Sequence, residues 1–301
     1  MNVLANYWPM EAALAIDIGA TKFAVGIVTR QGELLDRALV RLDQKWNSEQ
    51  LFDELARAVK EQTNRARGHH GADVVVVGVG SAGPITPNVE TVSPLNIEQW
   101  RDFPLRERLS TLTSLPVFGD GDAKALALAE GWLGAAKGVD NFMAMVVSTG
   151  VGGGIVLDGE LLEGATGNAG HVGHVVVEPN GRRCSCGGRG CLEAEASGPA
   201  IEAITGRPPT QPTYETMVRT GRLVGRAVAS VSNLLDLKLT VVGGSVALGF
   251  GATFFTAAQK TLDELCRIEF ARGARIVPAR LADEGPLIGA AAVGWRGFNR
   301  S

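Results

Sequence analysis

The chain is 301 residues long, more than one compact domain usually needs and enough for two. Hydrophobic residues make up 45% and charged residues 20%, close to the averages of globular proteins, which excludes wholesale disorder. Lysine and arginine total 29 against 32 acidic residues, and the net charge is −3 without a basic run. This balance argues against nucleic acid or an anionic membrane surface as a partner.

The N-terminus and the cysteines predict the cellular compartment. The first ten residues carry no positive charge ahead of the apolar run at 12–16, which Asp17 ends, so a secretory signal is not expected. No stretch reaches 18 apolar residues, so a membrane span is not expected either. Three of the four cysteines lie between Cys184 and Cys191, a crowding that is typical of metal ligands rather than of a disulfide framework. Together these features predict a cytoplasmic protein.

The first part of the chain predicts three antiparallel strands, a helix and a buried strand, in that order. Short apolar runs at 13–18, 23–28 and 34–40 are separated by glycine turns. Apolar residues recur at every fourth position over 51–59, which indicates a helix with one buried face. The continuous β-branched run at 74–77 is typical of a strand that is buried on both faces.

A second round of elements starts near Val117. The expected order is a helix at 123–129, strands at 142–147 and 155–157, a proline-rich loop at 206–213, a helix at 223–235, a strand at 239–242 and a helix at 287–295. A strand–glycine turn–strand unit at 14–28 therefore recurs at 143–157. This repeat indicates two similar α/β halves with a cleft between them.

Glycine, at 39 residues, is about twice as frequent as average, and three glycine-rich segments are candidate phosphate sites. The segment 78–83 matches G-x-G-x-x-G directly after a strand. A dinucleotide site requires a helix to begin there, which Pro84 and Pro87 disfavour. A turn that lines a cleft is the better interpretation of this segment.

The segments 17–22 and 148–154 suit the phosphates of a nucleotide better. In the first, Gly19 lets backbone amides point inward, Thr21 adds a hydroxyl and Lys22 adds a charge, while Asp17 is placed to hold magnesium through water. An ordinary hairpin with an exposed lysine is the alternative. The second segment has four glycines in five residues, an entropic cost that folding alone does not require. Two such hairpins that face one cleft would suit the β- and γ-phosphates.

A cysteine-rich segment predicts a zinc site. His174, Cys184, Cys186 and Cys191 supply one imidazole and three sulfurs, the ligand set of a closed tetrahedral site. The spacing differs from the usual C-x2-C, so a loop with free thiols is the alternative. His171 is a rival ligand, because it shares a face with His174 if the segment is helical. Four protein ligands leave no position for water, so this zinc would be structural.

These motifs, taken together, resemble the ROK family of sugar kinases and repressors. The matching segments, in order, are 17–22, 148–154, 170–174 and 184–193, and the likeness extends from about Leu14 to Ala292. The resemblance implies an α/β fold like that of actin and hexokinase, with two lobes, a duplicated mixed-sheet core and an inter-lobe cleft. The expected lobes are residues 1–117, completed by a C-terminal helix at about 286–301, and residues 118–285 with a zinc loop at 170–193.

The resemblance also implies a role for each matching residue. Asp122 occupies the position of the general base, which accepts the proton of the sugar hydroxyl during in-line attack. From the residues alone, Asp122 also fits a helix N-cap, and Asp120 is an equal candidate for the base. The implied sugar contacts are Asn96, His171, His174 and Glu193. The implied nucleotide and phosphate contacts are Asp17, Gly19, Thr21, Lys22, Thr149, Gly150, Gly243 and Gly244, with Ser245 beside the last.

Several positions depart from the pattern of ROK glucokinases. His171 stands where those enzymes carry a glutamate that contacts the sugar near its anomeric end, whereas bacterial N-acetylmannosamine kinases often have Gly-His-x-Gly-His, as here. Gly121 and Lys124 replace two asparagines that are expected beside the base, and Ala20 replaces a glycine of the first phosphate turn. We therefore expect phosphoryl transfer to be intact, with N-acetylmannosamine favoured over glucose.

The expected activity is that of a kinase that depends on ATP and Mg²⁺, contains structural Zn²⁺ and phosphorylates the 6-hydroxyl of a hexose or N-acylhexosamine. The resemblance implies a homodimer, and it leaves open whether polyphosphate replaces ATP. The repressor branch of the family needs a DNA-binding domain before the first phosphate turn, and only 16 residues precede Asp17. A non-catalytic sugar sensor is the other alternative, against which Asp122 and the two turns argue.

Overall fold

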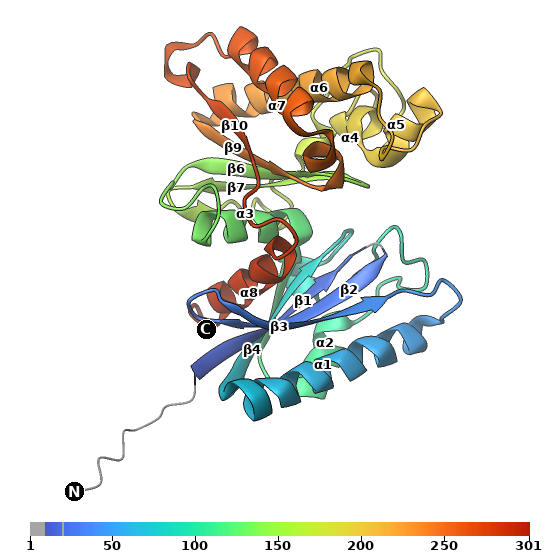
Figure 1. Cartoon of the computed structure of the whole chain (residues 1–301), viewed down its shortest axis with the longest axis vertical. Coiled ribbons are helices and arrows are strands. Elements are labelled where there is room, and N and C mark those ends of the chain that lie inside the picture. The colour runs from blue at the N-terminus through green and yellow to red at the C-terminus, as the bar shows by residue number, and fades with distance from the viewer. Residues whose placement is uncertain (1–9, 20) are drawn as a thin grey trace, which may run out of the picture. The chain divides into compact units, whose positions relative to one another are not determined.

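The computed structural model describes residues 10–19 and 21–301 and divides into two compact units, each built on a five-stranded sheet (Figure 1). Unit 1 comprises the chain up to Ala129 together with Asp283–Ser301, and unit 2 comprises Glu130–Ala282. The prediction about a secretory signal and the replacement at Ala20 concern residues that lie outside the described part of the chain.

The sheet of unit 1 has the strand order β3-β2-β1-β4-β5. Strands β1 (Met10–Ile18), β2 (Lys22–Thr29) and β3 (Leu34–Arg41) pair antiparallel, which confirms the three predicted strands. Strands β4 (Ala72–Ser81) and β5 (Val117–Gly121) continue the sheet in parallel with β1. The carboxyl ends of these three parallel strands therefore meet at one edge, which is where ligands bind in open α/β sheets.

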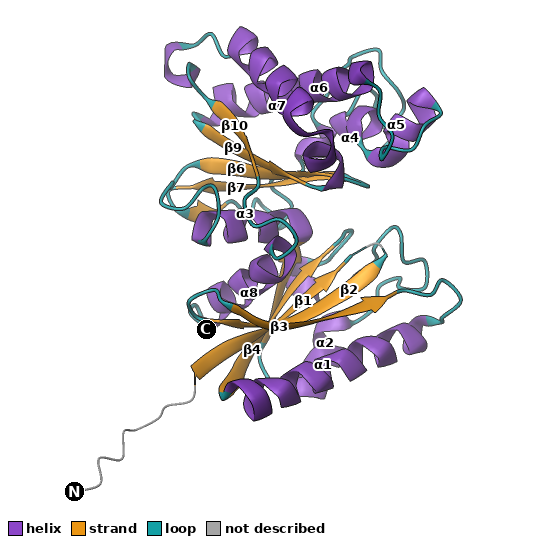
Figure 2. Cartoon of the chain, viewed as in Figure 1, coloured by secondary structure: helices purple, strands orange, loops and turns teal. Residues whose placement is uncertain are grey.

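Helices cover both faces of this sheet (Figures 1 and 2). On one face lie α1 (Ser48–His70) and α2 (Leu105–Thr113), and on the other lies α8 (Gly285–Phe298). Helix α1 begins at a capping box in which Asn47 and Gln50 exchange hydrogen bonds, and its predicted apolar face packs into the core. The short 3₁₀ helix η1 (Pro87–Val89) follows β4, and α3 (Asp122–Trp132) follows β5.

The predicted turn at 78–83 is wrong, because β4 continues through Ser81. A Cβ atom on Gly78 would lie 2.0 Å from the carbonyl oxygen of Ala290 in α8. Glycine at this position therefore lets α8 pack directly against the strand, and the segment has a packing role that sequence spacing does not distinguish from a phosphate loop. The next helical element after the segment is the short 3₁₀ helix η1, whereas a dinucleotide site requires an α-helix to begin directly after the strand.

Unit 2 repeats the topology of unit 1, with the strand order β10-β9-β6-β7-β8. Strands β6 (Phe142–Val147), β7 (Val151–Leu157) and β8 (Glu160–Leu161) pair antiparallel, and β9 (Leu239–Gly243) and β10 (Arg275–Pro278) pair in parallel beside β6. The correspondence confirms the duplicated α/β core. The helices are α4 (Leu192–Ala196), α5 (Gly198–Thr205), α6 (Tyr214–Leu235) and α7 (Ser245–Leu265), with 3₁₀ helices η2 (Val172–His174) and η3 (Glu269–Ala271).

Two predicted boundaries differ from the structure. The glycine-rich turn expected within 148–154 is shorter, because β7 begins at Val151 and takes in Gly153, where a Cβ atom would lie 2.9 Å from the Val172 side chain. The lobe boundary expected after residue 117 cuts β5 after its first residue, whereas all of β5 belongs to unit 1, where it pairs with β4. Among the described residues, no helix combines the length and the apolar character that a membrane crossing requires.

Candidate active site and metal centre

Asp17, Gly80 and Asp120 stand side by side at the carboxyl ends of β1, β4 and β5, because Asp17 is in register with Gly80 and Gly80 with Asp120. Asp122 follows as the first residue of α3. Three carboxylates therefore gather at one edge of the sheet in unit 1. Asp122, the predicted base, and Asp17, the predicted magnesium residue, therefore lie at the same edge, although 105 positions separate them in the sequence.

The two candidate bases differ in their partners. The carboxylate of Asp120 accepts a hydrogen bond from the amide of Gly121 at 2.8 Å and pairs with Lys124 Nζ at 3.3 Å. Lys124 is only 5% exposed, so this ion pair is largely removed from water. The carboxylate of Asp122 is exposed and accepts a hydrogen bond from the amide of Ala123 at 2.7 Å. Asp122 is therefore the more available of the two as a proton acceptor.

The electrostatics of the acidic edge favour a cation. Desolvation by the surrounding protein and the negative charge of Asp122 raise the pKa of Asp17 to about 7, against a lowering influence of Lys22. Desolvation also raises the pKa of Asp122, although its side chain reaches solvent. A divalent cation near Asp17 would offset the repulsion between the two carboxylates, so the pair fits the magnesium that accompanies ATP.

The first phosphate turn joins β1 to β2. The amide of Gly19 donates to the carbonyl oxygen of Lys22 at 3.1 Å, which closes the hairpin. The side chains of Thr21 and Lys22 are exposed and so remain accessible to a ligand.

Asn96 lies exposed on a turn of unit 1 whose conformation is firmly fixed. The guanidinium group of Arg101 donates to the carbonyl oxygens of Pro94 at 3.1 Å and of Ile97 at 2.7 Å. The neighbouring Trp100 is fully buried and stacks on Phe23, with ring centroids 5.1 Å apart, and on Phe103. The turn therefore presents Asn96 from a rigid base, as a sugar contact requires.

The second phosphate turn joins β6 to β7 in unit 2. The amide of Ser148 donates to the carbonyl oxygen of Gly150 at 2.9 Å, and Thr149 at its tip is exposed. The hydroxyl of Ser148 lies 2.8 Å from that of Ser245, the first residue of α7. This contact joins the turn to Gly243–Ser245, so the two segments of unit 2 that are predicted to bind nucleotide lie together.

The four predicted metal ligands converge. The ligand atoms of His174, Cys184, Cys186 and Cys191 all lie within 4.8 Å of one another, and the sulfurs of Cys186 and Cys191 are 3.7 Å apart. Tetrahedral zinc with Zn–S bonds of about 2.3 Å places its sulfurs about 3.8 Å apart, so the donor set and spacing fit zinc. These four side chains would hold the metal through protein atoms alone, and its role would then be structural.

The two histidines of this segment have different positions. Nδ1 of His174 lies 3.7 Å from the sulfur of Cys184, whereas His171 is outside the cluster, with its ring 6.2 Å from that of His174. The alternative assignment of His171 as the fourth ligand is therefore not supported. Since Nδ1 of His174 lies against the cluster, the sugar contact predicted for this histidine would have to use Nε2.

Removal of the metal tests this centre. We expect one zinc ion per chain by elemental analysis, and chelation should lower the melting temperature by roughly 5 °C or more, because the loop loses its cross-link. Cys186→Ser should have the same effect without chelator. Cys266→Ser is the matched control, since Cys266 is a buried cysteine outside the cluster and its replacement should leave the zinc content unchanged. Full zinc content in the Cys186 variant would contradict the ligand assignment.

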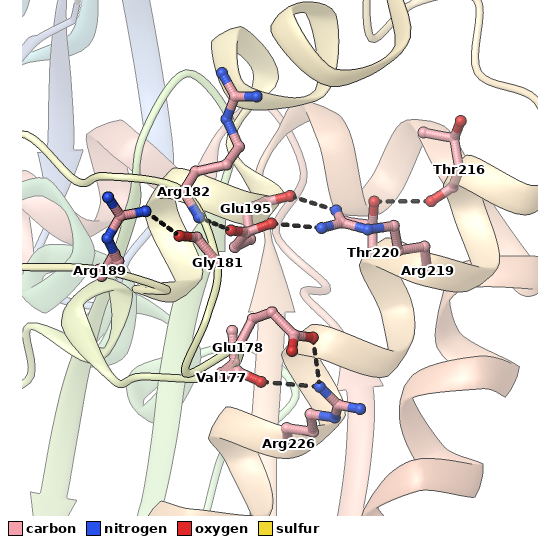
Figure 3. Close-up of polar contacts among 10 residues, drawn as sticks. All are labelled: Val177, Glu178, Gly181, Arg182, Arg189, Glu195, Thr216, Arg219, Thr220 and Arg226. Atoms are coloured by element: carbon pink, nitrogen blue, oxygen red, sulfur yellow. Dashed lines mark hydrogen bonds and ion pairs between the residues drawn. The ribbon is translucent and has the colours of Figure 1, made fainter.

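Several residues of the site region escaped the sequence analysis. A network in unit 2 ties the metal loop to α6: the carboxylate of Glu195 accepts from the amide of Arg182 at 2.6 Å and pairs with Arg219 (Figure 3). Glu195 is 2% exposed. The Lys124–Asp120 pair is also new, although its spacing of four residues at a helix start is a signal that could have identified it.

Comparison with known proteins identifies the family. The chain matches the ROK family over residues 13–295. An N-acetylmannosamine kinase of Yersinia pestis is 36% identical over 278 residues, which cover 86% of this chain and 92% of that protein. A glucokinase of Thermotoga maritima is 30% identical over 318 residues, with coverage of 95% and 98%. The chain belongs to the ROK family.

The fold comparison agrees with the sequence comparison. The crystal structure of a ROK hexokinase from Thermus thermophilus is similar with a TM-score of 0.80 at 31% identity, over 96% of this chain and 100% of that one. This likeness confirms the predicted two-lobed α/β fold with its duplicated mixed sheets. The inter-lobe cleft, the homodimer and the cytoplasmic location stay predictions.

Proposed function

We propose that this ATP-dependent sugar kinase of the ROK family transfers the γ-phosphate of ATP to the 6-hydroxyl of N-acetylmannosamine. The observation that carries the reaction is the acidic edge of unit 1, where an accessible Asp122 carboxylate lies near Asp17 while Asp120 is bound by Lys124. The choice of sugar rests on His171, which stands where the family's glucokinases have a glutamate, and on the 36% identity to an N-acetylmannosamine kinase.

In the proposed reaction, unit 1 supplies the base and part of the sugar contacts. Asp122 takes the proton of the 6-hydroxyl as the oxygen forms a bond to the γ-phosphorus and the bond from that phosphorus to the bridging oxygen of ADP breaks. Asn96 orients the sugar from its rigid turn. Asp17 would help to hold the Mg²⁺ that accompanies ATP, and that ion would neutralise charge on the phosphates.

Unit 2 supplies the remaining contacts. His174 and Glu193 bind sugar hydroxyls from the zinc-supported loop, and His171 recognises the region near the anomeric carbon and its neighbour. The amides of Thr149 and Gly150 stabilise charge on the transferred phosphoryl group, and Gly243 and Gly244 receive the adenosine. His174, Cys184, Cys186 and Cys191 would hold a structural Zn²⁺, which would fix the loop in the conformation that presents these side chains.

A sugar panel tests the proposal. ADP release should be measured with N-acetylmannosamine, glucose, mannose and N-acetylglucosamine, and kcat/KM for N-acetylmannosamine should exceed that for glucose by at least about tenfold. His171→Glu should narrow that ratio, because it restores the glutamate of the glucokinases. A wild-type preference for glucose would replace the proposed substrate with the alternative, a glucokinase. Sugar binding without any turnover would favour a non-catalytic sensor instead.

A further inference from the structure

The carboxylate of Glu193 reaches the second phosphate turn. Its Oε2 atom accepts a hydrogen bond from the backbone amide of Val151 at 2.9 Å, and a Cβ atom on Gly150 would lie 3.2 Å from the same oxygen. Glu193 is half-buried, and 42 positions separate it from Val151 in the sequence. The bond therefore joins α4 to the residue at which the turn ends and β7 begins.

Helix α4 has only five residues and depends on anchors at both ends for its position. On one side, Cys191 belongs to the metal cluster, and the amide of Leu192 donates to the carbonyl oxygen of Val175 at 2.9 Å. On the other side, Arg219 of α6 pairs with the buried Glu195 carboxylate and donates to the Glu195 carbonyl oxygen at 2.9 Å (Figure 3). These anchors fix the direction in which Glu193 points.

The metal-binding segment, residues 170–191, also packs on β7, the strand that follows the second phosphate turn. A Cβ atom on Gly173 would lie 2.1 Å from the carbonyl oxygen of Val151, and one on Gly170 would lie 2.4 Å from that of Gly153. At these two glycines, the backbone of the metal-binding segment lies directly against the backbone of β7, without side chains between them. The metal segment, α4 and the turn form one continuous set of contacts within unit 2.

We propose that Glu193 is a positioning residue for the second phosphate turn, so that the metal-supported helix α4 sets nucleotide affinity as well as sugar affinity. The inference rests on the proposed function, because it takes this turn to bind phosphate. By accepting from Val151, Glu193 holds the conformation in which the amides of Thr149 and Gly150 remain free to point at the ligand. A sugar contact alone would leave nucleotide binding in the absence of sugar unaffected.

Three substitutions of Glu193 separate the hydrogen bond from the charge. The non-hydrolysable ATP analogue AMPPNP should be titrated calorimetrically with Mg²⁺ and without sugar, using zinc-loaded protein. Glu193→Ala removes the acceptor, and Glu193→Asp keeps the charge but is one methylene too short to reach, so both should bind about tenfold more weakly. Glu193→Gln retains an acceptor oxygen and should bind within about threefold of the wild type.

Glu178→Ala is the matched control. Glu178 lies on the same metal-binding segment and pairs with Arg226 of α6, two helical turns from Arg219, but it does not contact the phosphate turn (Figure 3). Its removal should leave AMPPNP affinity unchanged. A second readout needs no nucleotide: hydrogen exchange at the Val151 amide should be slow in the wild type and in Glu193→Gln, and faster in Glu193→Ala.

The outcomes distinguish this inference from the proposed function. If the wild type binds AMPPNP and Glu193→Ala binds it with equal affinity, the positioning role is overturned and the kinase assignment stays intact. Failure of the wild type to bind AMPPNP would contradict the proposed function and this inference together. Weaker binding in Glu193→Ala and Glu193→Asp, with protection at Val151 retained in Glu193→Gln, would support both.

Discussion

Asp122→Asn should lower kcat by about 10²- to 10⁴-fold while the affinities for sugar and AMPPNP stay within about threefold of the wild type. The asparagine side chain preserves size and can still accept from the amide of Ala123, but it cannot take a proton from the sugar hydroxyl. Steady-state kinetics, combined with calorimetric binding of each ligand, separate the loss in turnover from any loss in binding.

Asp120→Asn is the natural comparison for that variant. Removing the charge of Asp120 leaves Lys124 as a buried cation without its full counter-charge, so this variant should melt at a lower temperature but keep kcat within about threefold. If Asp122→Asn retained more than about a tenth of the wild-type rate and Asp120→Asn did not, Asp120 would be the base.

Asp17→Asn should stabilise the protein at pH 8 and abolish most of its activity. The folded-state pKa of Asp17 is about 7, above the ordinary value of 3.8, so the folded chain holds this proton where the unfolded chain has lost it. The resulting stability is complete below about pH 4 and is lost as the pH rises through 7. At pH 8 the ionised carboxylate costs roughly 2 to 4 kcal/mol, allowing for its partial exposure, and asparagine removes that cost.

Melting temperatures of wild type and Asp17→Asn at pH 5 and pH 8 check this prediction. The difference in melting temperature between the two proteins should be larger at pH 8 than at pH 5, because only the wild type has the Asp17 carboxyl, which loses its proton over this range. Asp43→Asn, at an exposed position, controls for the loss of one negative charge and should show no such widening. A gap that is equal at both pH values would mean that Asp17 ionises normally in the folded chain.

Elements that a local sequence pattern determines could be predicted from the sequence. The strands of the two antiparallel hairpins and helix α1 are visible in the sequence because one periodicity governs each of them. The convergence of His174 with the three cysteines was also predictable, since cysteine is rare and a group of three within eight residues is typical of a metal site. The resemblance to the ROK family supplied the roles that spacing alone left open, such as the choice of Asp122 over Asp120.

Elements that depend on distant contacts were not predictable in this way. Helix α7 has a glycine-rich start and contains Gly251 with a φ of 58°, so its first turns resemble a loop. The short helix α4 is held in place by Cys191 at its start and by the Glu195–Arg219 pair near its end, and its five residues give no local pattern that predicts a helix. The bond from Val151 to Glu193 joins residues far apart in the chain, and only the folded structure brings them together.

The direct contact between Gly78 and Ala290 has a consequence for biosynthesis. Unit 2 is continuous in the chain, so it has all its residues as soon as Ala282 leaves the ribosome and can fold during translation. Unit 1 is discontinuous, and one face of its sheet stays uncovered until α8 has been made and packs against β4. The half of the enzyme that is synthesised first is therefore completed last, and this uncovered face is where chaperones would be expected to act on the nascent chain.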